Sequence, residues 1–359
     1  MSDRSRTPDV RLRVLAVVLI SCLFVSAATL AAAQPTDDTA TTIDACTTIT
    51  ESGTYVLAQD LSVETTGERC IDLRASNVEL DGDGHGINGN GSASIAIHVN
   101  KSVSEVTIRN LTIEDYAEVY EDYTEESVVV DGGNVTFENV DVVEADLLLD
   151  REALSVTITG GEFRNATISA YGVDEVVIED STFDTQWDPI DVSYYDDGRF
   201  VVRNNTIDTP TSAISMVTSG TTRIENNTVR VDGYRSTGIS VGDDALVANN
   251  TIQNATNGIY TSWDRNVTVV GNRIVGNEPF VDIDEPPRPG YGSIEGGVIV
   301  SDSHQVTVAE NEISTVYHGV VVHDTRDVTI EHNDVDGANE TGIEVARSDG
   351  LELTGDALT

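Results

Sequence analysis

Aromatic and carboxylate side chains gather in the middle of the chain around one recurrent short segment, a small residue followed by an apolar-x-apolar triplet. Flat aromatic faces stack on sugar rings, and carboxylates accept hydrogen bonds from sugar hydroxyls. The alternative is that the aromatic rings fill irregular corners of the fold. The sugar-binding candidates are Trp187, Asp188, Asp191, Tyr194, Tyr195, Tyr234, Tyr260, Trp263 and Tyr317.

The elements that must position these side chains come from a repeat. A phrase such as Val306-Thr-Val-Ala-Glu-Asn-Glu-Ile313 recurs about every 22 residues, with one spacing of 39 between its copies at Val267 and Val306. So short a unit holds brief strands and tight turns but no helix, and it buries its apolar edge only by stacking on its neighbours. The alternation of β-branched and polar residues predicts strands with one face inward and one in water.

This pattern indicates an all-β, parallel β-helix solenoid. A leucine-rich repeat would need a different leucine spacing, and a (β/α)8 barrel would need helices between its strands. Twelve coils are counted from Val78 to Leu351. At a strand spacing of about 4.8 Å they form a rod roughly 50–55 Å long. Ile214, Ile239 and Ile259 are expected to stack in one inward column.

Six asparagines share one register of the repeat. Inside a β-helix turn, each amide can donate to the carbonyl of the next, which satisfies buried polar groups at the corner. A structural ladder is therefore expected of Asn205, Asn227, Asn250, Asn272, Asn311 and Asn333.

The segment Cys70-Ile-Asp-Leu-Arg-Ala-Ser-Asn-Val-Glu-Leu-Asp-Gly-Asp-Gly-His-Gly-Ile87, with the Asn-Asn-Thr-Ile coils that follow, resembles the right-handed parallel β-helix repeat family. The resemblance covers roughly residues 46–359 and implies a right-handed solenoid. The family includes carbohydrate-binding proteins, sugar hydrolases and a periplasmic protein of copper-enzyme assembly. It hosts lyases, hydrolases, epimerases, adhesins and scaffolds, so it indicates a fold more than a function.

Motifs of particular enzymes are incomplete. Gly84-His-Gly86 resembles part of the polygalacturonase signature, but the paired aspartates and the Arg-x-Lys partner are missing. Asp188-Pro-Ile-Asp191 resembles the Asp-Pro-His-Asp motif of alginate C5-epimerases, with Ile190 in place of a histidine that could transfer a proton. No metal site or cofactor is expected, because the histidines of the last coils fall at different turn positions: His304, His318, His323 and His332.

Composition points to a salty environment. The chain has 62 acidic and 20 basic residues and a net charge of −42, and Lys101 is its only lysine. At molar salt the Debye length falls to about 3 Å, which screens this self-repulsion. The composition is similar to that of extreme halophiles such as haloarchaea. Such charge also argues against nucleic acid and anionic membranes as partners.

The N-terminal segment carries export signals. Arginines in residues 1–13 precede an uncharged stretch, Val14 to Ala33, that ends in a small-residue motif. We expect residues 1–33 to be a cleaved signal peptide, residues 34–45 a flexible spacer and residues 46–359 the β-helix domain, and the protein to be secreted or at the cell surface. The alternative is an uncleaved membrane anchor.

Cys46 and Cys70 are the only cysteines beyond the signal segment, and they lie about one coil apart. In an exported protein this spacing favours a disulfide over a metal site. The bridge is expected to pin an N-terminal cap, since solenoid ends fray. Eleven Asn-x-Ser/Thr sequons make some glycosylation plausible on exposed turns.

Loops supply a further indication. The 39-residue coil inserts residues 278–292, rich in proline, beside the aromatic segment, and residues 115–126 form a second candidate loop. The leading hypothesis is an exported β-helix protein that binds a polysaccharide or surface glycan along one face. The alternatives are a polysaccharide lyase, hydrolase or epimerase, and a non-catalytic structural module. Clustered carboxylates with a histidine or basic partner would favour an enzyme.

Overall fold

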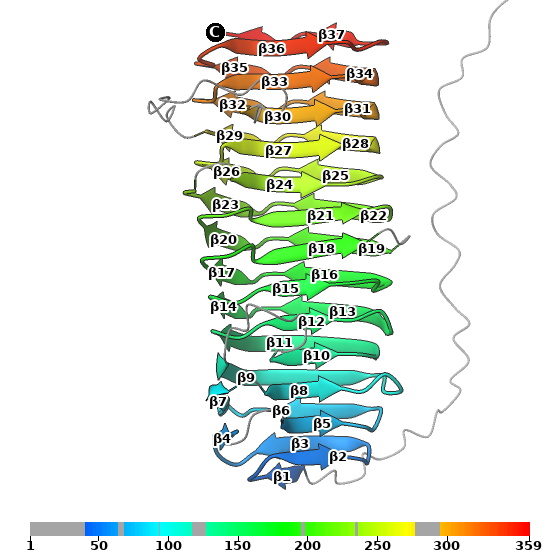
Figure 1. The fold of residues 1–359 in the computed structure, drawn as a ribbon, viewed down its shortest axis with the longest axis vertical. Coiled ribbons are helices and arrows are strands. Elements are labelled where there is room, and N and C mark those ends of the chain that lie inside the picture. The colour runs from blue at the N-terminus through cyan, green and yellow to red at the C-terminus, as the bar shows by residue number, and fades with distance from the viewer. Residues whose placement is uncertain are drawn as a thin grey trace, which may run out of the picture. The chain divides into compact units, whose positions relative to one another are not determined.

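The computed structural model describes residues 40–63, 68–92, 94–116, 127–194, 198–233, 236–276 and 295–359, without the side chains of residues 92, 193 and 194. These residues form strands and turns and contain no helix, so none of them could form a membrane-spanning helix. The coils stack one above another along a common axis (Figure 1). The segment expected to be a signal peptide (residues 1–33), the start of the expected spacer, Tyr195, Tyr234, the 278–292 loop and most of the 115–126 loop lie outside the described residues.

Two parallel sheets run along the axis, one with 25 strands (sheet A) and one with 13 (sheet B). Sheet B takes one strand from each coil: β2 (Thr47–Ile49), β5 (Arg69–Leu73), β8 (Ile95–Val99), β10 (Val128–Val130), β12 (Leu147–Leu149), β15 (Ile168–Ala170), β18 (Ile190–Tyr194), β21 (Ile214–Thr218), β24 (Thr237–Val241), β27 (Asn257–Ser262), β30 (Gly296–Ser301), β33 (His318–His323) and β36 (Thr341–Ala346).

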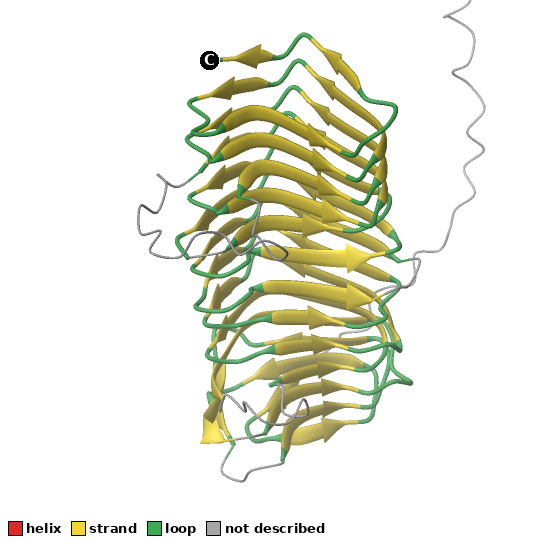
Figure 2. Cartoon of the chain, turned by 45° about the horizontal axis from the view of Figure 1, so that its top comes forward, coloured by secondary structure: helices red, strands yellow, loops and turns green. Residues whose placement is uncertain are grey.

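Sheet A contains two series of strands, because most coils bend once within it (Figure 2). The first series is β1 (Thr41–Ile43), β3 (Gly53–Leu57), β6 (Val78–Asp81), β9 (Val106–Tyr116), β11 (Gly133–Val143), β13 (Ala153–Thr159), β16 (Glu175–Glu179), β19 (Arg199–Arg203), β22 (Thr221–Glu225), β25 (Ala245–Ala248), β28 (Arg265–Val270), β31 (His304–Ala309), β34 (Arg326–Glu331) and β37 (Glu352–Thr354).

The second series of sheet A follows the bend, and the long strands β9 and β11 run through both series. Its other members are β4 (Leu61–Ser62), β7 (Gly86–Ser92), β14 (Glu162–Arg164), β17 (Thr182–Asp184), β20 (Thr206–Thr209), β23 (Thr228–Val231), β26 (Thr251–Gln253), β29 (Arg273–Val275), β32 (Glu312–Ser314), β35 (Asp334–Asp336) and β38 (Ala357–Leu358).

The stacking of coils agrees with the repeat. Ile214 pairs with Ile239 and Ile239 with Ile259, and all three side chains are fully buried, which confirms the inward column. The solenoid has about twelve turns. A coil that contains β2 and β3 precedes the first one counted from the sequence, at Val78.

The asparagine ladder is confirmed along the bend of sheet A. Each of the six asparagines is about 1% exposed. Asn227 Nδ2 donates to Asn250 Oδ1 at 2.9 Å and also to the carbonyl of Val202 at 2.9 Å. The preceding residue, Asn226, adopts φ 58°, a conformation that asparagine tolerates better than most residues. The repeated Asn-Asn pair therefore supplies one residue for the turn and one for the ladder.

The first coils hold the predicted disulfide. Cys46 and Cys70 are bonded, with their Cα atoms 4.3 Å apart, and they lie at the starts of successive strands of sheet B. Thr41–Ile43, inside the span 34–45 expected to be a flexible spacer, forms β1 and pairs with β3. Whether these coils act as a cap stays a prediction.

Candidate functional site

One outward position recurs in the middle of every strand of sheet B. The column starts with Thr48, Asp72 and His98, and it continues with Val129 and Leu148 in the next two coils. Since strand side chains alternate, these residues point away from the core while their neighbours Ile71, Ile97 and Val128 fill it. The apolar members of the column show that coil stacking does not require charge at this position.

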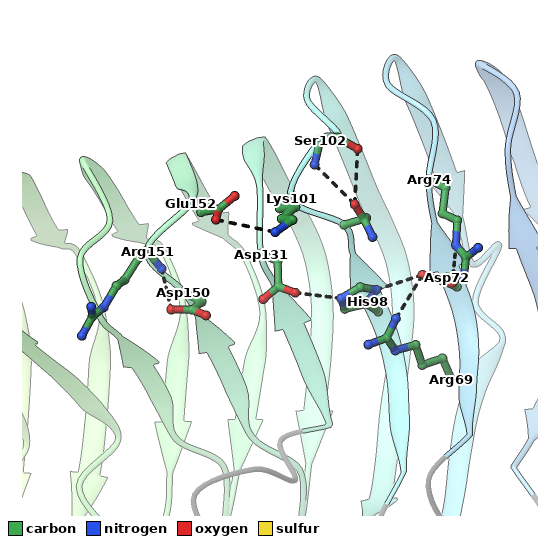
Figure 3. A network of polar contacts seen from close by, with 11 residues as sticks. Arg69, Asp72, Arg74, His98, Lys101, Ser102, Asp131, Asp150, Arg151 and Glu152 are labelled. Atoms are coloured by element: carbon green, nitrogen blue, oxygen red, sulfur yellow. Dashed lines mark hydrogen bonds and ion pairs between the residues drawn. The ribbon is translucent and has the colours of Figure 1, made fainter.

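His98 forms the centre of a polar network on this face. Its Nδ1 lies 2.9 Å from Asp72 Oδ1, and its Nε2 lies 2.9 Å from Asp131 Oδ2 (Figure 3). His98 and Asp72 are only 2% and 4% exposed, whereas the Asp131 side chain is 34% exposed. The three residues come from β5, from β8 and from the turn after β10. Asp131 is therefore the carboxylate of the pair that solvent or a ligand can reach.

Arginines complete the network at Asp72. Arg74 Nε donates to Asp72 Oδ2 at 2.7 Å, and Arg69 Nη1 lies 3.9 Å from Asp72 Oδ1. Burial by itself raises the pKa of the Asp72 carboxyl, but the hydrogen bonds from His98 and Arg74 outweigh it and hold that pKa below its usual value. Asp72 thus remains ionised and fixes the orientation of the His98 ring.

Further cations stand beside the network. Lys101 Nζ lies 4.0 Å from Glu152 Oε1, and both side chains are about two-thirds exposed. The backbone N–H of Arg151 donates to the Asp150 carboxylate (Figure 3). The network of Figure 3 holds four acidic residues (Asp72, Asp131, Asp150, Glu152) and four basic ones (Arg69, Arg74, Lys101, Arg151), against 62 and 20 in the whole chain.

Sheet A uses its arginines differently. Arg199 pairs with Glu175, Arg203 with Glu179 and Arg273 with Glu312, each across two hydrogen-bonded strands. These exposed pairs contribute little to stability individually, and each arginine faces the carboxylate of a neighbouring coil. Basic residues next to a buried histidine therefore distinguish the N-terminal part of sheet B from the rest of the described surface.

The network can perform acid–base chemistry or bind hydroxyl and carboxylate groups. Carboxylates only accept, so both contacts of His98 are hydrogen bonds only when the ring carries a proton on each nitrogen. A ligand oxygen that displaced Asp131 would meet Nε2 directly, and such a positioned imidazole is the commonest proton-transfer group of enzymes. Among the described residues, no three His, Cys, Asp or Glu side chains gather in a group that could hold a metal ion.

Those of the nine sequence-predicted residues that the structure describes lie farther along the solenoid. Tyr260 is outward on β27 and half-buried, next to inward Ile259, and Trp263 follows the strand and is 79% exposed. Trp187 and Tyr317 are partly exposed and precede β18 and β33, five strands apart in sheet B and so about 24 Å apart. The structure does not gather all of them into one cluster. Tyr195 and Tyr234, and the side chain of Tyr194, are outside the described residues.

The two candidate aspartates have different surroundings. Asp188 Oδ1 accepts from the backbone N–H of Ser212 in the next coil, at 2.9 Å, so this exposed carboxylate braces a turn. Asp191 lies in β18 at the same outward position as His98, four strands along the sheet. A sugar-binding role for either residue stays a prediction.

A buried carboxyl lies next to Trp263. Asp264 Oδ2 accepts from Thr261 Oγ1 at 2.7 Å and from the backbone N–H of Ser262 at 2.8 Å. Burial raises the pKa of Asp264 to about 6, although these two hydrogen bonds lower it. The residue braces the turn that presents Trp263.

A second histidine cluster lies at the other end of sheet B. Glu344 on β36 places Oε1 3.0 Å from His323 Nε2 and Oε2 3.3 Å from His318 Nδ1, and both histidines belong to β33. The ring of exposed Tyr317 meets His318 edge-on, with centroids 4.8 Å apart. The sequence places these histidines at different turn positions, and the structure brings them together only through Glu344.

The sequence interpretation missed Asp72, His98 and Asp131. A usable signal was present, because Ile71-Asp72-Leu73 and Ile97-His98-Val99 put one charged residue between two core residues in adjacent coils. A carboxylate and an imidazole at paired outward positions of two adjacent parallel strands are expected to contact each other.

The family model described as "Right handed beta helix region" matches residues 95–278 and 212–359. No match is found among curated proteins. The solved structure of the periplasmic alginate epimerase AlgG is 14% identical, with a TM-score of 0.52, and the match covers 85% of this chain and 78% of that one.

Two other solved structures are similar. The Streptococcus pneumoniae surface protein and adhesin PfbA is 13% identical, with a TM-score of 0.53 and coverage of 82% and 90%. The alginate lyase AlyF-OU02 is 13% identical, with a TM-score of 0.50 and coverage of 88% and 81%. At this identity the similarity establishes the fold alone, and the family match confirms its right-handed form.

Proposed function

This chain belongs to the right-handed β-helix family, and from that premise we propose that it binds a polysaccharide on the outer face of sheet B. The Asp72–His98–Asp131 network is the centre of the proposed site. The observation that carries the proposal is this buried, charged network at outward positions that apolar residues occupy in the next two coils. Similar folds include an alginate epimerase, an alginate lyase and a surface adhesin, which supports a carbohydrate ligand.

The exposed groups around the network suit a sugar chain. Lys101, Arg74 and Asp131 are accessible, and they offer cationic donors and a carboxylate acceptor on one surface. Charge-assisted hydrogen bonds of this kind are stronger than neutral ones. The aromatic residues farther along the face, Tyr260 and Trp263 among them, supply stacking surfaces for the same ligand.

A matched pair of charge reversals tests the proposal. Lys101→Glu alters the proposed site, whereas Arg164→Glu alters a comparable weak pair on sheet A, with Arg164 Nη1 3.8 Å from Glu162. Affinity for immobilised alginate and for a neutral linear glucan is measured in molar salt. We expect Lys101→Glu to weaken binding of at least one polymer about tenfold and Arg164→Glu to leave it unchanged. Equal effects, or no binding by the wild type, would refute the site.

A second function, catalysis, is favoured by the geometry of His98. Asp72 fixes the ring from the buried side, as in sites where a carboxylate orients a proton-transferring histidine. The candidate reactions are those of a lyase, an epimerase or a hydrolase. Assays for unsaturated products, for solvent deuterium in the sugar and for new reducing ends separate them. Activity that His98→Gln abolishes would establish catalysis, and its absence from all three assays would leave binding alone.

The proposal includes the setting of the protein. A cleaved signal peptide over residues 1–33 and a disulfide are compatible with an extracellular location, and the charge of −42 suits a halophile. Unscreened repulsion between carboxylates then destabilises the fold in dilute buffer. The melting temperature is expected to fall as NaCl is reduced from molar to millimolar. A constant or rising melting temperature would contradict halophilic adaptation.

A further inference from the structure

Trp263 occupies a corner position whose equivalents in the following coils are charged residues. Ser262 pairs with Ser301, Ser301 with His323 and His323 with Ala346, so Trp263 is equivalent to Asp302, Asp324 and Arg347. All four corner residues have positive φ, at 69°, 49°, 54° and 51°. The same turn is therefore built with aspartate in the next two coils, with an arginine that pairs with Asp324 in the coil after them, and with tryptophan here.

Tryptophan is a poor choice for this turn on structural grounds. Aspartate and asparagine tolerate left-handed backbone conformations, whereas a bulky side chain there is a true outlier. The ring does not compensate by packing, because Trp263 is 79% exposed. Neither the backbone nor the core explains the residue, and strain of this kind is found mostly at functional sites.

The same edge of sheet B carries the cations of the His98 network. Lys101, Arg151 and Trp263 each stand two residues after Val99, Leu149 and Thr261, which are aligned through successive parallel pairings. The strands β8 and β27 are seven steps apart in sheet B. At about 4.8 Å a step, Lys101 and Trp263 lie about 34 Å apart along the axis.

We propose that one extended, linear polysaccharide lies along this edge, parallel to the solenoid axis, and stacks a sugar ring on Trp263 while the Lys101–Arg151 end holds its polar groups. The inference rests on the proposed function and specifies its ligand as a chain long enough to span about 34 Å. Contact at both ends makes the second attachment intramolecular, which raises affinity for long chains above that for short ones.

The test uses Trp263→Asp, which installs the residue found at this corner in the next two coils. Because the turn prefers aspartate, this variant is expected to fold with an unchanged or higher melting temperature. Its affinity for long alginate or linear glucan chains should fall at least tenfold, to the level of oligosaccharides too short to reach from Lys101. Leu154→Asp, which removes another exposed apolar side chain, from β13, should leave the affinity for long chains unchanged.

The outcomes separate this inference from the proposed function. If Lys101→Glu weakens binding and Trp263→Asp does not, the site stands and the two-point inference is overturned. If affinity does not rise between short and long chains in the wild type, the inference is equally overturned. If the wild type retains neither polymer, the proposed function and the two-point inference both fail. The inference is supported if Trp263→Asp, and not Leu154→Asp, loses the higher affinity for long polysaccharide chains.

A fluorescence measurement gives an independent readout. The chain has two tryptophans, so Trp187→Phe leaves Trp263 as the only indole. Stacking of a sugar on this exposed ring should shift its emission to shorter wavelength as long alginate or glucan chains are added. Unchanged emission at a polymer concentration that saturates retention would refute stacking on Trp263.

Discussion

The asparagine ladder and the His98 network are both polar arrays that cross successive coils, and they differ in repetition and charge. The ladder has six buried neutral amides in one register; the first five each donate to the next, and Asn333 donates to the Asp356 carboxylate. The network has one copy, contains carboxylates, arginines and an imidazole, and lies on the outer face. In a fold made of repeats, what recurs in every coil supports the coil, and what departs from the repeat needs another explanation.

The energetics support this distinction. A satisfied neutral amide adds a modest net stabilisation and avoids the larger cost of an unpaired buried group. A buried ionic network gives weak evidence for stability, because desolvation offsets the attraction between its charges. Val129 and Leu148 fill the same column as His98 without charge. We therefore expect the ladder to carry stability and the network to carry function.

The largest expected effect is on the ladder. Asn250→Ala removes hydrogen bonds to Ile224 and Asn272 and leaves the Asn227 amide without its acceptor. Several buried groups then lack partners, and the free energy of unfolding should fall by about 4 kcal/mol. Denaturant titration in molar salt measures it. Asn249→Gly, one position earlier in the exposed turn, should cost less than about 1 kcal/mol. Polysaccharide affinity of folded Asn250→Ala should equal that of the wild type, and a lost affinity would break the comparison.

His98→Gln should have the reverse effect of Asn250→Ala, with a large loss of polysaccharide affinity and a smaller loss of stability. Glutamine leaves Asp72 and Asp131 with fewer donors, so unfolding free energy should fall by about 2 kcal/mol. Polysaccharide affinity should fall at least tenfold, because the network loses its central donor. Isothermal titration and denaturant titration on the same preparation compare the two losses. A variant that loses stability but keeps full affinity would make the network another piece of scaffold.

Two buried carboxyls should respond to pH with opposite signs. The lowered folded pKa of Asp72 gives stability that is complete above its unfolded pKa of about 4 and is lost as the pH falls below it. Asp264, with a folded pKa of about 6, binds a proton in the folded state first, so its burial destabilises the fold as pH rises from about 4 to 6. Asp264→Asn should therefore gain on the order of 1 kcal/mol at pH 7. Asp72→Asn should lose stability at pH 7, and its deficit should shrink below pH 4.

Melting curves of both variants between pH 3 and 8 check these signs. The gain of Asp264→Asn should shrink as the pH falls from about 6 to 4 and vanish below pH 4, where the wild-type carboxyl becomes protonated in the unfolded state as well. A parallel pH dependence for the two variants would mean that neither carboxyl is in the environment described.

The smallest expected effect concerns Trp263. Replacement by aspartate relieves a left-handed turn of a bulky side chain, so the unfolding free energy should rise by no more than about 1 kcal/mol. Differential scanning calorimetry measures this gain in stability, with Leu154→Asp, which relieves no turn, as the control. A clear loss of stability would show that the ring supports the fold, and it would remove the structural argument for a binding role.

Particular residues show how far the sequence could go. The ladder and the isoleucine column follow from register, and the Cys46–Cys70 bridge follows from the number and spacing of cysteines in a chain expected to be exported; the structure confirms each. The grouping of His98 with Asp72 and Asp131 was not predicted, since these residues are 26 and 33 positions apart in the chain. Those separations exceed the 22-residue period, because the coils between β5 and β8 and between β8 and β10 are longer than the usual repeat.

The sequence by itself determined the coil, because every repeat has the same local pattern of inward and outward residues. When such similar units stack, only one register buries the apolar side of each. Only the tertiary structure decided which outward residues meet. Contacts on the outer face depend on coil lengths and turn geometry that vary from one repeat to the next, and core burial does not constrain them. His98 therefore lies between two carboxylates, and Trp263 shares an edge with Lys101, through alignments that no single segment of the sequence records.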